Sequence, residues 1–459
     1  MLETIETFIA DLSSLLWGWP MIIMLFGCHI FMTIRLKFPQ RKLLTGIKLS
    51  LSKEEGAEGD VSQFGALVTS LAATIGIGNI VGVATAIALG GPGAVMWCWM
   101  SGILGIATKY GEALLAVKYR VKGSDGQMIG GPMYAIERGM GPKWKWLAIL
   151  FAVFTVLASV GIGSTVQSNA FATVVHDTIG VSKYLSGGLI TLAVACVILF
   201  GVKGIANVCT KLVPAMTLLY LAGCAYILIA NAPFLGESIS LIVSSAFTPR
   251  AAGGGFVGAA VMTAARFGIA RGLFSNESGM GSAPIVAAAA KSRNPVRQAL
   301  ISSTGTFWDT VVICAVTGIV LVSTVVAHPE IESNAGGLLT ELAFNKIPYI
   351  GSYILMLCLA IFSFSTILGW TYYAEKAVQY LGGTRLIKYF RIIWIAIVFA
   401  GAVMEMSLVW NIADVVNVFM ALPNIIVLIV LSGVIARETK YYLWENRLNE
   451  FSPEDKKEE

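Results

Sequence analysis

The chain has 459 residues, of which 56% are hydrophobic and only 13% are charged, and its formal net charge is +5. A soluble domain carries about 25% charged residues, so the composition excludes an ordinary soluble fold and favours an integral membrane protein. Apolar stretches such as LITLAVACVILFGV lack the alternation of barrel strands, so we expect an all-α membrane protein.

Apolar runs near the length needed to cross a bilayer predict about eleven transmembrane helices. The first run begins after an acidic segment, MLETIE, instead of the basic region of a removable signal peptide, so we expect it to remain as a span. The predicted spans are 15–35, 64–89, 93–117, 145–175, 184–202, 209–230, 256–290, 298–326, 349–379, 390–406 and 411–436.

The positive charges test this count and orient the chain. With the N-terminus outside, most of the 32 lysines and arginines fall in inner loops or in the C-terminal tail, and only Lys183, Arg250 and Lys346 fall in outer loops. This distribution predicts a multi-pass protein of the plasma membrane with a cytoplasmic tail, residues 437–459, whose end EFSPEDKKEE we expect to be disordered. The positive charge therefore indicates orientation in the lipid bilayer, and we expect no nucleic-acid partner.

Two predicted spans contain stretches that are poor helix formers. TIGIGNIVGVA, residues 74–84, places three glycines and an asparagine inside an apolar run. RGLFSNESGMG, residues 271–281, interrupts the run 256–290 and adds an ionisable residue. Each glycine costs a helix about 1 kcal/mol relative to alanine. Close packing of small residues is one interpretation, but irregular backbone buried at membrane depth predicts two broken helices.

The positions of the two interruptions predict an internal symmetry. After the helix 15–35, the first break lies in the first of five helices, and the second lies in the first of the next five. An odd number of spans in each half inverts the second half, as in transporters with their site at the midplane. We therefore expect a single domain, 1–459, with an extra helix 15–35, a first repeat 64–230 and a second repeat 256–436. Free amides at such breaks suit a carboxylate, and free carbonyls suit a small cation.

Three motifs in order resemble those of one family. GGPGAVMWCWMSGILG (90–105), GIGNIVGVATAI (76–87) and RGLFSNESGMGSAP (271–284) are similar to segments of the alanine or glycine:cation symporters, the sodium:alanine symporter family. The resemblance covers nearly the whole chain. It implies a leucine-transporter-like fold with ten core helices in a five-plus-five inverted repeat and one extra N-terminal helix. It also implies sodium-coupled import of small neutral amino acids, chiefly alanine and glycine, by alternating access.

The same resemblance implies the residues that bind the substrate carboxylate and the coupling ion, Na⁺. The first broken helix would supply the substrate contacts of Thr74, Gly76, Ile77 and Gly78, with the amides around the last two binding the carboxylate. A first sodium site would consist of the carbonyls of Ala72 and Ile75 and the hydroxyls of Ser365 and Thr366. A second would consist of the Thr74 carbonyl, Asn79 and Ser275. Hard oxygen ligands of these kinds suit a hard cation.

Other residues would shape the substrate pocket. Phe274 would form an aromatic wall, and Trp370, four residues after Thr366 on the same helix face, would restrict the pocket to alanine-sized ligands. Gln167 is a polar residue near membrane mid-depth that would contact the substrate. Core packing for Trp370 and a bridge between helices for Gln167 remain open alternatives.

Ionisable residues inside the spans have two interpretations. Arg266 and Arg271 would face the interior or an outer vestibule, where they could act as gate residues. Glu277 and Asp309 would pair with them or cap backbone groups, so for Glu277 we expect a structural role.

Three alternatives to a sodium symporter differ in what they require. A proton-coupled amino-acid permease of the same fold would use a titratable group such as Glu277 in place of sodium. A channel would not need paired broken helices. A membrane enzyme would need a cluster of histidine, cysteine or carboxylate side chains, and the sequence places none together, so we expect no enzymatic activity.

Overall fold

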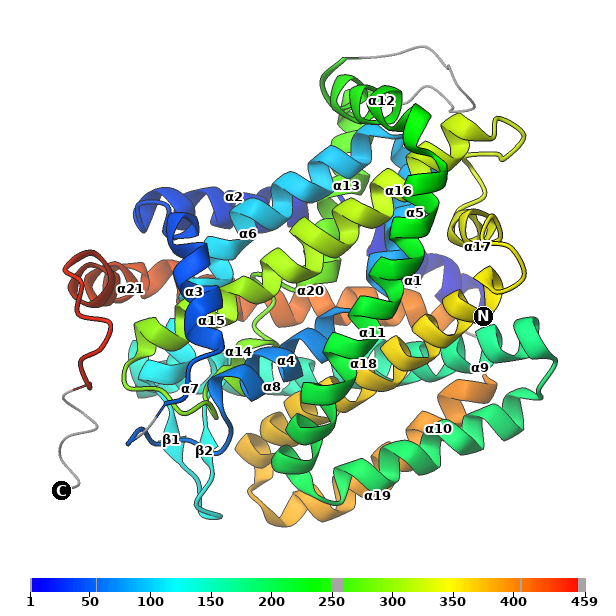
Figure 1. Cartoon of the computed structure of the whole chain (residues 1–459). Helices are drawn as coiled ribbons and strands as arrows, with labels where there is room; N and C mark the ends of the chain where they lie inside the picture. Colours follow the sequence, from blue (N-terminus) through cyan, green and yellow to red (C-terminus); the bar gives the residue numbers. More distant parts are fainter. Residues whose placement is uncertain (1, 55, 249–259, 405–406, 453–459) are drawn as a thin grey trace.

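A computed structural model describes residues 2–54, 56–248, 260–404 and 407–452, and this part of the chain folds into a helical bundle (Figure 1). The helices of the first half are α1 (Leu2–Leu16), α2 (Trp19–Arg35), α3 (Leu43–Ser50), α4 (Gln63–Thr74), α5 (Val83–Gly90), α6 (Gly93–Lys118), α7 (Pro132–Tyr134), α8 (Lys145–Ala158), α9 (Val166–Ile179), α10 (Lys183–Ile198), α11 (Gly201–Ala230) and α12 (Leu235–Phe247). Those of the second half are α13 (Val261–Asn276), α14 (Pro284–Ala287), α15 (Pro295–Thr306), α16 (Ala315–Ala327), α17 (Leu338–Phe344), α18 (Gly351–Gly382), α19 (Arg385–Val403), α20 (Ser407–Val430) and α21 (Ser432–Thr439).

The described residues also contain one short β-hairpin. Strands β1 (Val121–Lys122) and β2 (Met128–Ile129) pair antiparallel, with Val121 opposite Ile129. The hairpin lies with α3 and α21 at one end of the bundle, whereas α1, α12 and α17 lie toward the other end (Figure 1). The sequence analysis expected the N-terminus and the tail from residue 437 to lie on opposite sides of the bilayer, and this orientation stays a prediction.

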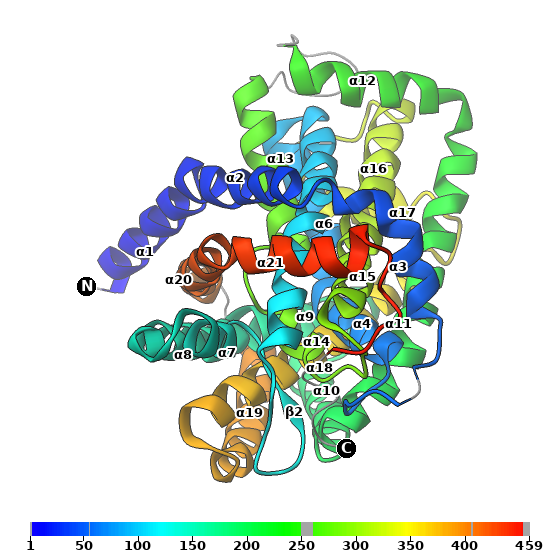
Figure 2. The same ribbon diagram turned by 90° about the vertical axis from the view of Figure 1, so that its left-hand side faces the viewer.

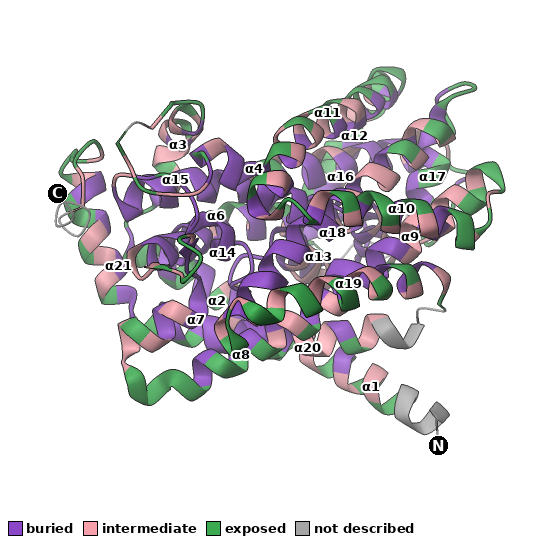
Figure 3. Cartoon of the chain, turned by 90° about the horizontal axis from the view of Figure 1, so that it is seen from below, coloured by how far each residue is buried: buried purple, intermediate pink, exposed green. Residues whose placement is uncertain are grey.

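The buried helices are those that carry the two breaks and their neighbours. Helices α13 and α15 both pack along α6, and α18 packs against α4, α9 and α11. Figure 3 shows buried residues gathered on these central helices, while the peripheral helices expose one face. The site candidates lie on the central helices, where most of them are buried and only Gly78 and Phe274 are partly exposed.

The outer helices present apolar side chains to the surroundings. Helices α10 and α19 lie side by side (Figure 1), and they expose Leu185, Leu189 and Leu192 on one and Ile392 and Ile393 on the other. A soluble protein rarely exposes so continuous an apolar surface, whereas a bilayer requires one. The peripheral faces therefore have the apolar character that a bilayer requires.

Length and composition identify part of the predicted set of spans. Among the described residues, seven helices are long and apolar enough to cross a membrane, and the bent pair formed by α4 and Gly78–Gly90 makes an eighth. The protein is therefore a multi-pass membrane protein. The count of eleven stays a prediction, because α6, α10 and α13 fall outside this test although their positions in the chain match predicted spans.

Several predicted boundaries were wrong in informative ways. The first span extends back as two helices, α1 and α2, with a bend at Trp17–Gly18, and α1 projects beside α20 (Figure 2). Helix α11 begins at Gly201, eight residues before the predicted start at 209. The last span, 411–436, is interrupted after Val430, where α21 begins in a new direction (Figure 2).

Three predicted spans contain π-helical segments. These are Gly78–Gly82 before α5, Ser159–Thr165 between α8 and α9, and Phe307–Cys314 between α15 and α16. A π-helical turn inserts a residue into the helical ladder and is frequently found at functional sites. All three segments lie next to residues of the candidate site described below.

Candidate functional site

The first break lies where the glycines predicted it. Helix α4 ends at Thr74, and Ile75 has an extended backbone conformation (φ −74°, ψ 102°). The chain then turns by 54° into Gly78–Gly90. The side-chain oxygen of Asn79 accepts a hydrogen bond from the Gly76 amide at 2.9 Å. The break is therefore held by its own asparagine, which occupies the amide of Gly76, one of the predicted substrate contacts.

The second break is longer than predicted. Helix α13 ends at Asn276, and Glu277, Gly279 and Gly281 all have positive φ angles of 54°, 90° and 85°. Only the four residues of α14 become helical again before residue 290, so the second half of the predicted span 256–290 is a single turn. Residues 256–259 of that span lie outside the described residues. Glycine tolerates such angles without strain, which explains two of the three residues.

A buried polar cluster joins the two breaks. The amide nitrogen of Asn79 donates to the Ser275 hydroxyl and to the Asp309 carboxylate, each at 2.8 Å. Ser275 in turn donates to the other carboxylate oxygen at 2.8 Å, and Thr310 donates to the same oxygen at 2.7 Å. Asn79 and Asp309 are fully buried. We refer to Asn79, Ser275, Asp309 and Thr310 as the junction cluster.

Asp309 is the residue whose role the sequence analysis missed. It was expected to pair with an arginine or to cap backbone groups, but its hydrogen-bond partners among the described residues are the neutral side chains of the junction cluster. A carboxylate within a span is by itself a sign of function. Its position in a π-helical segment, which turns it toward Asn79 and Ser275, could not be read from the sequence.

The hydroxyl groups of Ser365 and Thr366 on α18, which were predicted to bind one ion together, point to different helices. Thr366 donates to the Ala72 carbonyl at 3.2 Å and lies 3.5 Å from the Ile75 carbonyl, so these three oxygens converge at the end of α4. The hydroxyl of Ser365 instead donates to the Phe362 carbonyl at 2.9 Å and lies 3.6 Å from the sulfur of Met216. The structure therefore brings Thr366 together with the two carbonyls and turns Ser365 toward α11.

Gln167 and Phe274 both lie beside the first break. A Cβ atom at Gly76 would lie 2.9 Å from the Thr366 hydroxyl and 3.9 Å from the side-chain oxygen of Gln167, which is buried without a hydrogen-bond partner. A Cβ atom at Gly78 would lie 3.5 Å from the ring of Phe274. The missing side chain at Gly76 therefore lets the Thr366 hydroxyl approach the backbone closely, whereas Gln167 and Phe274 lie at ordinary contact distance.

Trp370 is fixed by a glycine on the neighbouring element. It is 1% exposed, and a Cβ atom at Gly163 would lie 2.4 Å from its Cβ atom, so the indole packs directly on the π-helical segment Ser159–Thr165. Its ring stacks edge-on against Tyr373 at 5.5 Å, and its indole nitrogen is buried without a partner. The bulk of Trp370 is therefore close to the start of α9, which carries Gln167.

Comparison with known protein families identifies the family of this chain. The model described as the sodium:alanine symporter family matches residues 2–457. The chain belongs to this family. It is therefore a membrane transporter and not an enzyme.

Relatives are similar over almost their full length. An uncharacterized transporter of Haemophilus influenzae is 48% identical, over 98% of this chain and 99% of its own. The sodium/alanine symporter AgcS of Methanococcus maripaludis is 45% identical, over 94% of this chain and 95% of its own. The probable sodium/glutamine symporter GlnT of Bacillus subtilis is 36% identical, over 96% and 91%.

Solved structures confirm the expected leucine-transporter-like fold. MhsT in complex with L-phenylalanine has a TM-score of 0.56 at 16% identity, over 86% of this chain and 96% of that chain. A mutant of the Eremococcus coleocola manganese transporter has a TM-score of 0.56 at 14% identity, over 85% and 89%. At these identities the likeness establishes the fold alone, so the substrate has to be argued from the residues of this member of the sodium:alanine symporter family.

Two cavities adjoin the site of this family member on the side of α1, α17 and α9. One, of about 300 Å³, is lined by Ile77 and Ile80 of the first break and by residues of α9, α17, α18 and α20. The other, of about 170 Å³, is lined by Arg266, Arg271 and Phe274 of α13, with α1 and Asp414. The first cavity leads from the surface to the backbone assigned to the substrate.

The two arginines differ in their contacts. Arg266 donates to the backbone carbonyl of Ser14 at 3.3 Å and so fastens α13 to α1. The guanidinium of Arg271 lies over the Phe274 ring at 5.9 Å from its centre. Glu277 accepts a hydrogen bond from the Ser282 hydroxyl within the second break, which fits the structural role expected for it.

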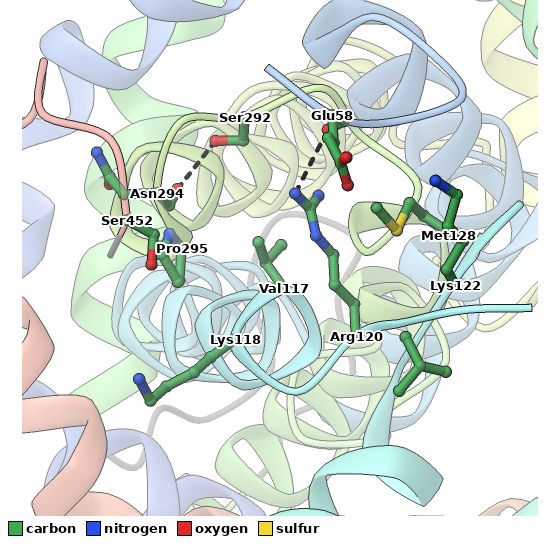
Figure 4. Close-up of a pocket in the computed structure, with 11 residues that line it drawn as sticks. Glu58, Val117, Lys118, Arg120, Lys122, Met128, Ser292, Asn294, Pro295 and Ser452 are labelled. Carbon is green, nitrogen blue, oxygen red and sulfur yellow. Dashed lines mark hydrogen bonds between the residues drawn. The ribbon is translucent and has the colours of Figure 1, made fainter. Parts of the chain in front are cut away.

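At the opposite end, segments flanking the two broken helices are bound to each other. The Lys291 amide donates to the Val61 carbonyl at 2.9 Å, and Arg120 donates to the carbonyls of Ala290 at 2.9 Å and Glu58 at 3.3 Å. Figure 4 shows Arg120 extending across a cavity of about 190 Å³ toward Glu58. These contacts join the approach to α4 with the exit from α14.

Proposed function

We propose that this protein is a sodium-coupled symporter that imports small neutral amino acids, chiefly alanine and glycine, across the plasma membrane by alternating access. The observation that carries the proposal is the junction cluster, where a fully buried carboxylate joins the two broken helices and its direct partners are neutral. A buried charge is costly unless it is paired, so Asp309 favours binding of a cation beside it.

Two groups of oxygens fit a hard monovalent ion. The first consists of Thr366 with the carbonyls of Ala72 and Ile75, and we do not include Ser365 because its hydroxyl points to Met216. The second consists of Ser275 and Asp309 with Asn79. In this second group, sodium would require the Asn79 amide to rotate so that its oxygen, now bonded to Gly76, faces the ion. The sodium/alanine symporter AgcS, 45% identical, supports sodium as the coupling ion.

The proposed substrate pocket lies beside the first break. The amides around Ile77 and Gly78 would bind the carboxylate, Gln167 and Thr366 would contact the polar groups, and Phe274 would close one side. The tight packing of Trp370 on Gly163 leaves little freedom for the indole to move, which supports its role as a steric limit. GlnT, 36% identical, carries a name with a larger amino acid. We therefore assign the preference for alanine and glycine to this pocket rather than to the family as a whole.

The distribution of basic residues supports the orientation that import requires. The N-terminus would lie outside, and α21 and the tail would lie in the cytoplasm. The 300 Å³ cavity would then open to the outside, and the bound segments around Arg120 and Lys291 would close the cytoplasmic end.

A proton-coupled permease is the second candidate, and Asp309 is the observation that favours it. A proton on Asp309 would neutralise the buried carboxylate as a sodium ion would. The two candidates differ in whether sodium is needed for substrate binding at constant pH.

Ligand-dependent protection against heat tests the proposal. Purified protein in detergent would be heated with alanine, glycine or glutamine in sodium chloride or in choline chloride. Binding stabilises the folded state by about 2.7 kcal/mol when the ligand is at one hundred times its Kd. We expect protection by alanine and glycine only in sodium chloride. Equal protection in choline chloride would favour the proton-coupled candidate, and protection by glutamine alone would contradict the assigned substrate.

A further inference from the structure

Glu112 on α6 lies against the second break and has no place in the function proposed so far. One of its carboxylate oxygens accepts hydrogen bonds from the amides of Gly279 and Gly281, each at 3.0 Å. The same oxygen accepts a bond from the side chain of Asn424 on α20 at 2.7 Å. Asn424 also donates to the Gly279 carbonyl at 2.8 Å. Both side chains are buried, with exposures of 2% and 1%.

These bonds take amides that would otherwise continue α13. In an α-helix each amide donates to the carbonyl four residues earlier. The Gly279 amide would therefore bond the Ser275 carbonyl, but it donates to Glu112. The Ser278 amide would bond the Phe274 carbonyl, but it donates to the side chain of Asn276.

The remaining amides of the break are also engaged. The Met280 amide donates to the Glu277 carbonyl at 3.1 Å, and the Glu277 amide closes the last turn of α13 by donating to the Leu273 carbonyl at 3.1 Å. The amides of residues 277–281 thus all have acceptors. The carbonyls at the end of α13, by contrast, have lost their helical donors. The second break therefore presents acceptors, which suit a positive group, at the negative end of the α13 dipole.

Packing fixes this arrangement on the other side. A Cβ atom at Gly279 would lie 2.5 Å from the Leu25 side chain, and one at Gly281 would lie 2.8 Å from the Asn424 side chain. Lys109, one helical turn before Glu112 on α6, is also buried and adds a positive charge on that side. The break is thus held by α2, α6 and α20, and it is not free to close into a helix without breaking these contacts.

We propose that Glu112 and Asn424 are positioning residues that keep the carbonyls of Phe274 and Ser275 available for the positive groups of the cargo, the substrate ammonium and the sodium ion. The inference rests on the proposed function.

Three variants test the role of Glu112. Glu112→Leu removes the hydrogen-bond acceptor but keeps a side chain of similar size. Glu112→Gln retains one acceptor oxygen, and Glu375→Gln is the control. Glu375 is a carboxylate of similar burial, 4% exposed, that pairs with Arg391. The first readout is the melting temperature of each variant. The second is the KM and the maximal rate of alanine uptake into proteoliposomes in saturating sodium. Lactate, which has a hydroxyl group in place of the ammonium, is added as a competitor.

Because Glu112→Leu removes hydrogen bonds to a charged group, we expect it to raise the KM for alanine roughly tenfold or more, with a smaller change in maximal rate. Glu112→Gln should recover much of the affinity, and Glu375→Gln should leave the KM unchanged. Lactate should compete weakly with alanine in every variant. If Glu112→Leu lowered the melting temperature but kept the KM of the parent protein, the positioning role would be wrong.

Asn424→Leu keeps the inference testable if Glu112→Leu does not fold. It leaves the Glu112 acceptor in place and releases the Gly279 carbonyl, so the KM for alanine should rise, although less than in Glu112→Leu. An unchanged KM in a folded Asn424→Leu protein would overturn the inference. Failure of the parent protein to bind alanine in sodium is a different result, since it would refute the proposed function itself.

Discussion

The hydroxyl of Thr366 on α18 donates to the carbonyl of Ala72 on α4, 3.2 Å away, two residues before that helix ends. This contact joins α18 to α4 and places a side-chain oxygen beside the backbone oxygens released by the first break. It also separates Thr366 from its neighbour Ser365, whose hydroxyl faces Met216.

The sodium dependence of transport should therefore respond to Thr366 and not to Ser365. Thr366→Ala removes an oxygen that we propose as a sodium ligand, and we expect the sodium concentration for half-maximal uptake to rise about tenfold because one interaction with the ion is lost. Ser365→Ala should change it by less than about twofold, and Thr366→Ser should be close to the parent protein. Uptake measured at increasing sodium concentrations gives this value for all three variants. Equal defects in Thr366→Ala and Ser365→Ala would show that Ser365 also binds the ion.

Asp309→Asn should weaken cation binding more than it weakens the fold. Asparagine keeps the size of the side chain and can still accept from Ser275, but it removes the negative charge that offsets a cation. We expect sodium-dependent protection against heat to be lost while the unliganded melting temperature stays close to that of the parent protein. Asp177→Asn, at the 300 Å³ cavity, is the control and should keep sodium-dependent protection. If Asp309→Asn bound sodium normally, the junction cluster would not be a cation site.

Trp370 should determine the upper size of the substrate. Trp370→Leu opens space next to Gly163, so larger amino acids such as glutamine should inhibit alanine uptake in the variant and not in the parent protein. Truncation of a large buried side chain costs up to about 3–5 kcal/mol of stability, so a lower melting temperature is expected as well. Trp394→Leu, at a fully buried tryptophan on α19, controls for that cost. A substrate range that broadened equally in both variants would argue that general loosening, and not the pocket wall, is responsible.

The connection between the loop before α8 and the end of α18 should depend on pH. The Tyr380 hydroxyl donates to Glu137 at 2.6 Å, and Lys145 pairs with the same carboxylate at 3.0 Å. These two contacts hold the pKa of Glu137 below its usual value of 4.5, and the hydrogen bond from Tyr380 contributes most to this shift. Because the folded state favours the charged form, the stabilisation is complete above that value and is lost as the pH falls through the lower folded pKa.

Tyr380→Phe should therefore lower the melting temperature at neutral pH, and the difference from the parent protein should shrink as the pH falls through the lowered pKa of Glu137. Tyr389→Phe, at an exposed tyrosine on α19, should behave as the parent protein at every pH. A difference for Tyr380→Phe that stayed constant with pH would mean that the lost hydrogen bond does not act through the charge of Glu137.

The sequence predicted the breaks because their cause is local. Gly76, Gly279 and Gly281 weaken the helix at those positions whatever the surroundings are, and the backbone does leave the helix there. The family motifs then predicted the fold, which the comparisons confirm. The length of the second break was not predictable, because the residues after Gly281 include good helix formers and the segment is held open by α6 and α20.

The contacts that define the site are mostly not local. Glu112 and the Gly279 amide are separated by 167 residues in the chain, and no spacing rule connects them. Ser365 and Thr366 are adjacent, yet they project about 100° apart on the helix, so only the position of α4 decides which one meets the carbonyls. Lys109 and Glu112 did leave a trace in the sequence, as two charges one turn apart in an apolar span, which by itself indicates function.

Uptake of labelled alanine into proteoliposomes tests the central claim most directly. With an inward sodium gradient and equal pH on both sides, alanine should accumulate above its external concentration, and collapse of the sodium gradient should release it. Accumulation driven by a proton gradient in the absence of sodium, or equilibration without accumulation under the sodium gradient, would contradict the account.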